Sequence, residues 1–132
     1  MTIHDPKMPK GNGANLDRSI HPGSGRRKTR EFPKGRLELV NIAGQTLGRA
    51  TYRPGWKWSV DVGPGVGARR CTVEHLGIVL AGHATAAFDD GRVFDLTAGT
   101  IFYIPPAPHD SWVVGDEPYV SLHLLGASHY AR

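Results

Sequence analysis

Short apolar segments alternate with turn residues from Gly35 onward, and this spacing limits the fold more than any other feature of the chain. No segment keeps a helical period, and turn signals such as Asp-Asp-Gly at residues 89–91 separate neighbouring segments. The pattern is typical of an all-β sandwich or barrel. It predicts strands at residues 37–43, 46–53, 57–61, 69–81, 84–88, 92–96, 100–104, 111–114 and 119–125.

The length and the cysteine content narrow the class of protein. A chain of 132 residues has the size of one domain with one modest core. It has a single cysteine, Cys71, so no disulfide can form within it. No apolar run approaches the roughly 18 residues that span a bilayer, and the N-terminus lacks the apolar segment of a secretory signal. We therefore expect a soluble cytoplasmic protein with no membrane partner.

Basic residues are concentrated near the N-terminus. Residues 1–36 carry a net charge of +6, whereas residues 37–132 carry −2. Because residues 1–34 also lack a periodic apolar pattern, we expect a flexible basic arm, or one that orders only against a partner subunit, before a domain at residues 35–132. The basic run at residues 26–30 could contact nucleic acid. No aromatic residue interleaves with it, so a solvated linker is the preferred interpretation and no nucleic-acid partner is expected.

Strand alternation places His75 on the small-residue face of its predicted strand. Between residues 71 and 81, one face holds Cys71, His75 and mostly small side chains, and the other holds bulkier ones. We infer that the first face lines a cavity into which both side chains point. Four residues of straight strand separate α-carbons by about 13 Å, so the chain has to turn or bulge before Cys71 and His75 can share an ion. The alternative for Cys71 is a small buried hydrophobic side chain.

Three further histidines lie on or beside predicted strands. His109 follows the sequence IPPAP, whose prolines restrict the backbone and can fix the angle of an imidazole ring. His123 lies on the last predicted strand, either as a donor in the cavity or as a half-buried, hydrogen-bonded side chain. His83 directly follows a glycine turn and is expected to be exposed, although it too could be a donor. Neutral imidazoles suit transition metals, so these histidines and His75 are candidate ligands.

The residues before Gly82 resemble the first sequence motif of the cupins, small jelly-roll barrels whose two motifs supply metal ligands. That motif has two histidines one residue apart, then a glutamate, and then a glycine seven positions after the glutamate. Gly82 matches the glycine, which puts His75 at the glutamate position. Arg69 and Cys71 then occupy the positions of the paired histidines.

The residues that end at His109 resemble the second cupin motif, which has a glycine, a proline six positions later, a turn glycine and a histidine. Gly99 and Pro105 match, Ala107 replaces the turn glycine, and His109 arrives one position early. The runs HLGIVLAG, DDG, IPP and WVVGDEP are similar to those of small bacterial single-domain cupins. The resemblance extends over residues 52–126.

The resemblance implies an all-β cupin jelly-roll barrel made of two antiparallel sheets, in which the two motifs meet around a divalent transition metal (Zn, Fe, Ni or Mn). Because the resemblance implies that the two motifs meet inside the barrel, His75 and His109 are the preferred pair of ligands, and a third donor would complete the site. The candidate ligands are His75, His109, Cys71 and His123, with His83 as a further option for the third donor.

Three other residues are candidates for contact with a small-molecule ligand. Arg69 can bind a carboxylate or phosphate with two hydrogen bonds, or it is a surface arginine beside Arg70. Tyr103 lies within the second motif and is expected to contact the ligand, and Trp112 starts the strand after the motif and is expected to wall the pocket. Two functions remain open: a metal-dependent enzyme of the dioxygenase or isomerase type, and a binding or sensing protein without metal. We also expect a homodimer, because a partner's N-terminal strand can cover an exposed sheet edge.

Overall fold

The structure, a computed structural model, describes residues 27–127 and is built mainly from β-strands. Within that part of the chain, nine strands form two antiparallel sheets and two one-turn helices follow the third strand. The elements in chain order are β1 (Arg27–Phe32), β2 (Gly35–Ile42), β3 (Gln45–Tyr52), α1 (Trp58–Asp61), α2 (Gly63–Val66), β4 (His75–Ala81), β5 (His83–Phe88), β6 (Val93–Thr97), β7 (Ile101–Ile104), β8 (His109–Val113) and β9 (Tyr119–Leu125).

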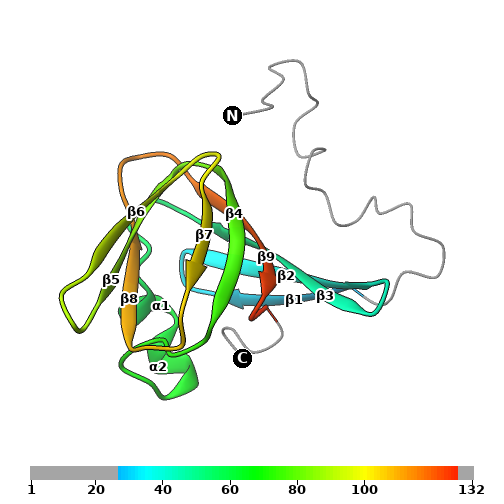
Figure 1. Ribbon diagram of the computed structural model, residues 1–132, viewed down its shortest axis with the longest axis horizontal. Coiled ribbons are helices and arrows are strands. Elements are labelled where there is room, and N and C mark those ends of the chain that lie inside the picture. Colours follow the sequence, from blue (N-terminus) through cyan, green and yellow to red (C-terminus); the bar gives the residue numbers. More distant parts are fainter. Residues whose placement is uncertain (1–26, 128–132) are drawn as a thin grey trace.

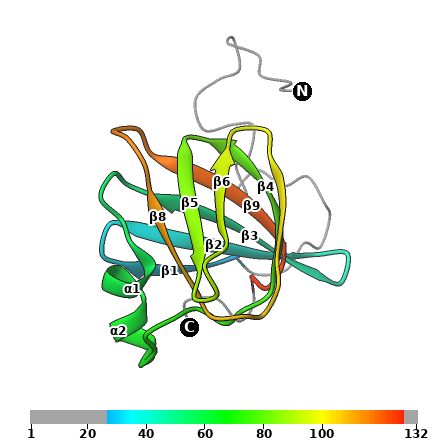
Figure 2. The same cartoon turned by 60° about the vertical axis from the view of Figure 1, so that its left-hand side comes forward.

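The two sheets differ in size and face each other. The larger has the strand order β1-β2-β3-β9-β4-β7, and the smaller has the order β6-β5-β8. In Figure 1 the smaller sheet stands opposite the end of the larger sheet that contains β4 and β7, and the helices lie below β8. Figure 2 shows β5, β6 and β8 in front of the strands of the larger sheet. The predicted all-β fold with two antiparallel sheets is confirmed.

Strand β4 shows how the sequence pattern produces the barrel interior. His75, Gly77 and Val79 are buried, whereas the residues between them are partly exposed and Leu80 is 39% exposed. The predicted alternation, with the small-residue face inward, is therefore correct for this strand. The apolar core into which it packs includes Leu37, Ala50, Tyr52, Trp56, Trp58, Val79, Ala84, Ala86, Phe88, Leu96, Phe102, Ile104 and Tyr119.

Gly77 permits the close approach of β4 and β9. A Cβ atom at this position would overlap the carbonyl oxygen of Leu122 and lie 2.8 Å from the ring of Phe102. Only glycine fits such a gap without movement of the backbone. The position of His75 two residues earlier thus depends on a residue with no side chain.

The expectation of an unstructured arm up to residue 34 is wrong for residues 27–32. These residues form β1, which pairs with β2 of the same chain from Arg27 opposite Val40 to Phe32 opposite Gly35. Backbone pairing along its whole length holds this edge strand, and Phe32 at its end packs against the core beside the ring of Tyr52, so the strand forms without a periodic apolar face. Residues 1–26, the rest of the predicted arm, lie outside the described residues.

Two predicted strands are also corrected. Of the predicted strand at 57–61, residues Trp58–Asp61 form α1 instead, a turn closed by the backbone hydrogen bond from the N–H of Asp61 to the carbonyl of Lys57, while the carboxylate of Asp61 accepts a hydrogen bond from the N–H of Lys57. The predicted strand at 69–81 begins only at His75, and the residues before it follow an irregular path.

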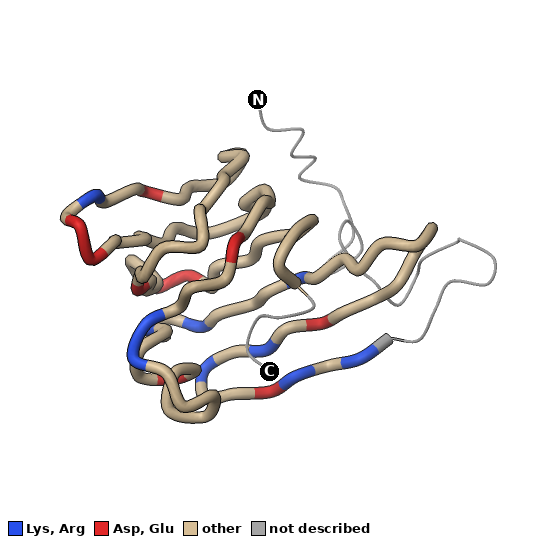
Figure 3. Tube along the Cα trace, turned by 60° about the horizontal axis from the view of Figure 1, so that its bottom comes forward, with Lys and Arg blue, Asp and Glu red and all other residues tan. Residues whose placement is uncertain are grey.

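Basic residues are concentrated on one edge strand of the larger sheet. Figure 3 shows Lys and Arg along β1, the strand that continues from the grey N-terminal trace. Part of the basic run singled out in the sequence therefore lies on an edge strand of the larger sheet. Among the described residues, no helix is long and apolar enough to cross a bilayer.

Candidate metal centre and the adjoining cavity

Cys71 lies close to His75 because the chain turns between them. Cys71, which lies outside the named strands, forms an isolated antiparallel bridge with His109 at the start of β8, and β4 begins at His75. The Sγ atom of Cys71 is 3.5 Å from Nε2 of His75. Between Cys71 and His75 the chain therefore departs from a straight strand, as it must if both side chains are to bind one ion.

His109 joins this pair from the other motif. Its Nδ1 lies 2.8 Å from the carbonyl oxygen of Ala107, and a carbonyl can only accept, so Nδ1 carries the proton and Nε2 keeps its lone pair. Ligand atoms of Cys71, His75 and His109 all lie within 4.8 Å of one another, and all three residues are buried. The structure therefore brings together the two histidines chosen from the sequence and one of the candidate third donors.

Burial keeps these three side chains uncharged in the absence of an ion. It raises the pKa of the Cys71 thiol to about 11. It also lowers the pKa of His109, and it lowers the pKa of His75 well below its ordinary value, with a further contribution from the neighbouring histidines. Neutral imidazoles are ready to bind a metal, whereas the thiol has to release its proton first.

His123 lies beside this cluster rather than in it. Its Nε2 is 3.0 Å from the hydroxyl oxygen of Ser121, and its ring centroid is 5.4 Å from that of His75. Burial lowers its pKa to about 4. The prediction that His123 supplies a metal ligand is not supported by this arrangement, because its ring nitrogen binds Ser121 and the group of converging ligand atoms does not include it.

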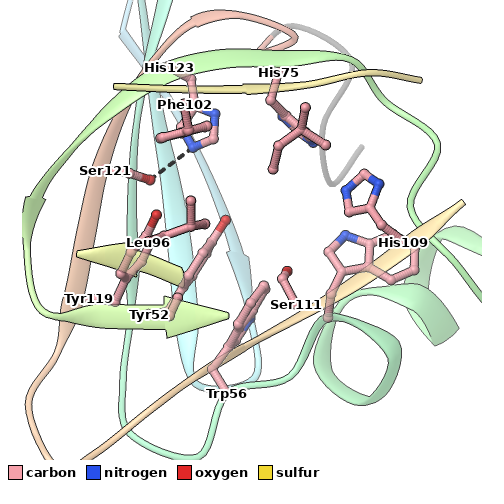
Figure 4. A pocket seen from close by; sticks show the side chains of 13 residues that line it. Tyr52, Trp56, His75, Leu96, Phe102, His109, Ser111, Tyr119, Ser121 and His123 are labelled. Carbon is pink, nitrogen blue, oxygen red and sulfur yellow. Dashed lines mark hydrogen bonds between the residues drawn. The ribbon is translucent and has the colours of Figure 1, made fainter. Parts of the chain in front are cut away.

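A small cavity adjoins the cluster (Figure 4). Its volume is about 40 Å³, room for roughly three water molecules. No Lys, Arg, Asp or Glu is among its lining residues, which are Tyr52, Trp56, Trp58, His75, Ala84, Leu96, Phe102, Ile104, His109, Ser111, Tyr119, Ser121 and His123. The site is therefore apolar and aromatic, with hydroxyl, imidazole and indole groups as its polar members.

Stacked aromatic rings form one wall of the cavity. The rings of Tyr52 and Trp56 are parallel with centroids 3.7 Å apart, and Tyr119 stacks on the other side of Tyr52 at 5.7 Å. Figure 4 shows Trp56 next to Tyr52 and on the same side of the cavity as Ser111. Such a wall is rigid, because each ring is held by its neighbours.

Three residues expected to contact a ligand lie elsewhere. Arg69 is exposed and does not line the cavity. Tyr103 is 56% exposed, and its hydroxyl donates a hydrogen bond to Glu74 on the outside of the sheet. Trp112 faces away from the cavity, where its ring lies 5.2 Å from the ammonium group of Lys57. Alternation explains the last two errors, because Phe102 and Ser111, one residue earlier in each strand, point inward.

Two polar residues near the site have other partners. Asp110, next to His109 in the chain, accepts hydrogen bonds from the backbone N–H and hydroxyl of Ser59. His83 lies on β5 with its Nε2 3.3 Å from a carboxylate oxygen of Asp95, and it does not line the cavity. His83 is therefore no longer a candidate for the third metal ligand.

The sequence interpretation missed the aromatic wall. Tyr52 and Trp56 come from the end of β3 and the loop after it, where no motif marks them. Tyr119 and Ser121 could have been found, because they alternate with His123 along one strand and so share its face.

Comparison with models of protein families finds no match to this chain, and comparison with curated proteins finds none either. Solved structures do match it. A DUF1255 protein of unknown function from Acinetobacter sp. ADP1 has a TM-score of 0.58 at 14% identity, covering 82% of this chain and 97% of that one. A protein of unknown function from Rhizobium leguminosarum has a TM-score of 0.54 at 19% identity, covering 70% and 80%.

A larger enzyme shares the same architecture. The oxalate decarboxylase of Lactobacillus farciminis, solved as a formate complex, has a TM-score of 0.54 at 22% identity and is matched over 76% of this chain but only 31% of its own. The chain has a cupin-like jelly-roll fold. Likeness at this level of identity concerns the fold alone.

Proposed function

We propose that this chain is a small single-domain cupin that binds one divalent transition metal through Cys71, His75 and His109 and a small organic molecule in the adjoining cavity. The convergence of three buried ligand atoms within 4.8 Å carries the proposal. A thiolate and two imidazoles suit Zn, Fe or Ni better than Mn, which prefers oxygen ligands. Three protein ligands leave a coordination position open for a small molecule.

The reaction that we propose is of the dioxygenase or isomerase type. The metal would supply Lewis-acid or redox chemistry at the open position. The protein would contribute a cavity that excludes bulk water and aromatic surfaces that orient the bound molecule. The fold is shared with an oxalate decarboxylase, an enzyme named for a small carboxylate substrate, and this is compatible with a small organic ligand in the cavity.

A second candidate is a binding or sensing protein without catalysis. It is favoured by the titration behaviour of the cavity, where burial lowers the pKa of His123 to about 4 and raises the pKa of Tyr119 to about 12. Neither group exchanges a proton readily near neutral pH. The same cavity and a metal used only for ligand binding would serve this function.

The test of metal binding is a measurement of metal content. The full chain is produced without a histidine tag, exposed to Zn, Fe, Ni and Mn in turn, and analysed by mass spectrometry of the metals. We expect about one ion per chain, lost in Cys71→Ser, His75→Ala and His109→Ala. The matched control is His83→Ala, which removes a histidine from β5 outside the cluster and should retain the ion.

Two results would reject the proposal. The first is a correctly folded wild-type chain, by circular dichroism, that retains none of the four metals after desalting. The second is equal loss of metal in His83→Ala and His75→Ala, which would place the ion elsewhere. If metal is bound but no turnover follows with small carboxylates and carbonyl compounds under air, the binding function replaces the enzymatic one.

A further inference from the structure

We propose that the cavity beside the metal ligands selects a small monocarboxylate, about the size of acetate, and rejects both neutral analogues and dianions. The inference rests on the proposed function, because it assumes a divalent ion at Cys71, His75 and His109. It deepens that function by naming the class of ligand. Three independent features of the cavity lead to it: its charge, its unpartnered donors and its size.

The charge of the loaded site favours an anion with one negative charge. A bound cysteine is a thiolate and bound histidines are neutral, so a divalent ion on these ligands leaves one net positive charge. None of the other lining residues is Lys, Arg, Asp or Glu, so none adds a further full charge. A monoanion therefore brings the site to neutrality. A dianion leaves an uncompensated negative charge in an apolar cavity, which is strongly unfavourable.

Two buried donors in the lining need an acceptor. Trp56 is 1% exposed and Trp58 is 4% exposed, and both indoles line the cavity. Neither Nε1–H group has a hydrogen-bond partner among the described residues. Indole nitrogen is a donor only, so these groups are satisfied by a ligand that presents oxygen lone pairs. A carboxylate supplies two acceptor oxygens, one for the metal and one for an indole.

The size of the cavity limits the rest of the ligand. A volume of about 40 Å³ accommodates roughly three water molecules, and hence a ligand of only a few non-hydrogen atoms. The remaining surface that such a ligand meets is apolar, from Leu96, Phe102 and Ile104. A methyl group or a short carbon chain fits this environment, whereas a second charged group does not.

The experiment uses the zinc-loaded full chain and measures binding rather than turnover. Isothermal titration compares acetate with acetamide, which has the same shape but no charge. It then compares oxamate with oxalate, which have the same number of non-hydrogen atoms but carry one and two negative charges. We expect acetate to bind at least about tenfold more tightly than acetamide, and oxamate to bind more tightly than oxalate. Zinc content is measured before and after each titration, because a chelating ligand can remove the metal.

Tryptophan variants test the donors. Trp56→Phe and Trp58→Phe keep an aromatic ring but remove the N–H, and each donor that binds the carboxylate should cost about tenfold in acetate affinity. Trp112→Phe is the matched control, because this third tryptophan does not line the cavity. A measurement without mutation supports it: in nitrogen–proton correlation spectra, acetate should shift the indole N–H signal of Trp56 or Trp58 and leave that of Trp112 in place.

The outcomes separate the two proposals. A zinc-loaded chain that ignores acetate, binds acetamide equally well, or binds oxalate as tightly as oxamate overturns the monocarboxylate inference and leaves the metal site intact. Acetate binding with unchanged indole signals and unchanged affinity in both tryptophan variants overturns the role of the indole donors. A chain that retains no zinc overturns the proposed function, and the charge argument falls with it.

Discussion

The backbones of Cys71 and His109 pair through two hydrogen bonds, with N···O distances of 2.9 and 3.0 Å. Residues directly opposite each other in an antiparallel pair project to the same side, so this bridge presents the thiol and the imidazole together. His75 then reaches the thiol from the start of β4. The geometry of the candidate metal centre is thus set by backbone pairing as well as by side-chain packing, and several expectations follow from it and from the surrounding fold.

Metal affinity should rise with pH, because the chain should release one proton for each metal ion that it binds. Burial raises the pKa of the Cys71 thiol to about 11, so the thiol is protonated in the metal-free chain near neutral pH. The pKa values of His75 and His109 are lowered, so both imidazoles are already neutral there. Binding of zinc then displaces one proton, and the apparent dissociation constant should fall about tenfold per pH unit. Competition with a chromophoric chelator between pH 7 and 9 measures the slope. A slope near zero would show that the thiol is not a ligand.

The metal-free chain should lose stability as the pH falls through the range from about 6.5 to 4. Burial lowers the pKa of His123 from 6.5 to about 4, so below 6.5 the unfolded chain takes up a proton that the folded chain does not. The loss from this residue alone is on the order of 3 kcal/mol when pH 4 is reached. Urea unfolding at a series of pH values measures it. His123→Phe should flatten the profile in this range, whereas His83→Ala should not; equal slopes in both would contradict the argument.

Replacement of Gly77 should destabilise the sheet at the junction of β4 and β9. A Cβ atom would overlap the carbonyl oxygen of Leu122, so Gly77→Ala should reduce the free energy of unfolding by about 2 kcal/mol or more. The control is Gly65→Ala, because nothing lies within 4 Å of a Cβ atom there. Thermal or urea unfolding compares the two variants. An unchanged midpoint for Gly77→Ala would mean that the strands are less closely packed than described.

Asp110 should matter for the stability of α1 rather than for the metal. Its carboxylate accepts hydrogen bonds from the N–H of Ser59, 3.0 Å away, and from the hydroxyl of Ser59, 2.7 Å away. Asp110→Ala removes both and should cost about 1–3 kcal/mol of unfolding free energy while leaving the metal content unchanged. Asp116→Ala, in an exposed loop, serves as the control. Loss of metal without loss of stability would instead assign Asp110 to the support of His109.

The homodimer stays a prediction, and one edge of the larger sheet is the place to test it. Strand β7 lies at that edge, and its Ile101 is 74% exposed. Exposed apolar side chains at an open edge favour association with a second copy. Light scattering should give the mass of a dimer for the wild type and of a monomer for Ile101→Lys. Val60→Lys, at a similarly exposed residue on α1, should remain dimeric. If light scattering gives the mass of a monomer for the wild type, the homodimer prediction is wrong.

The strands could be predicted where alternation and turns agreed, and were missed where backbone pairing alone forms them. The predicted strand at 119–125 matches β9, because its buried residues alternate along its first half. β1 could not be found in this way, since an edge strand rich in Lys and Arg buries little. The segment at 57–61 was assigned to the wrong class because one helical turn is too short to show a period.

The site was predicted in part, and its errors have a common cause. His75 and His109 were chosen as imidazoles from the two motifs that meet in the barrel, and Cys71 because alternation puts it on the same face as His75; the structure brings the three together. Tyr103 and Trp112 were assigned to the pocket one residue out of phase, which moves a side chain to the opposite face of a strand. Single-sequence patterns place strand boundaries only to within a few residues, and an error of one residue is enough to turn a lining residue outward.

The central place of β9 has a consequence for biosynthesis. This strand pairs with β3 on one side and β4 on the other, and it is the only described strand that joins the two halves of the larger sheet. In chain order residues 119–125 follow every other described strand, so the two halves of the larger sheet can be joined only after this segment has left the ribosome and until then are two separate ribbons. A prematurely terminated polypeptide that lacks this segment would leave both ribbons with open inner edges. Such a fragment would be prone to aggregate and would be a target of cellular quality control.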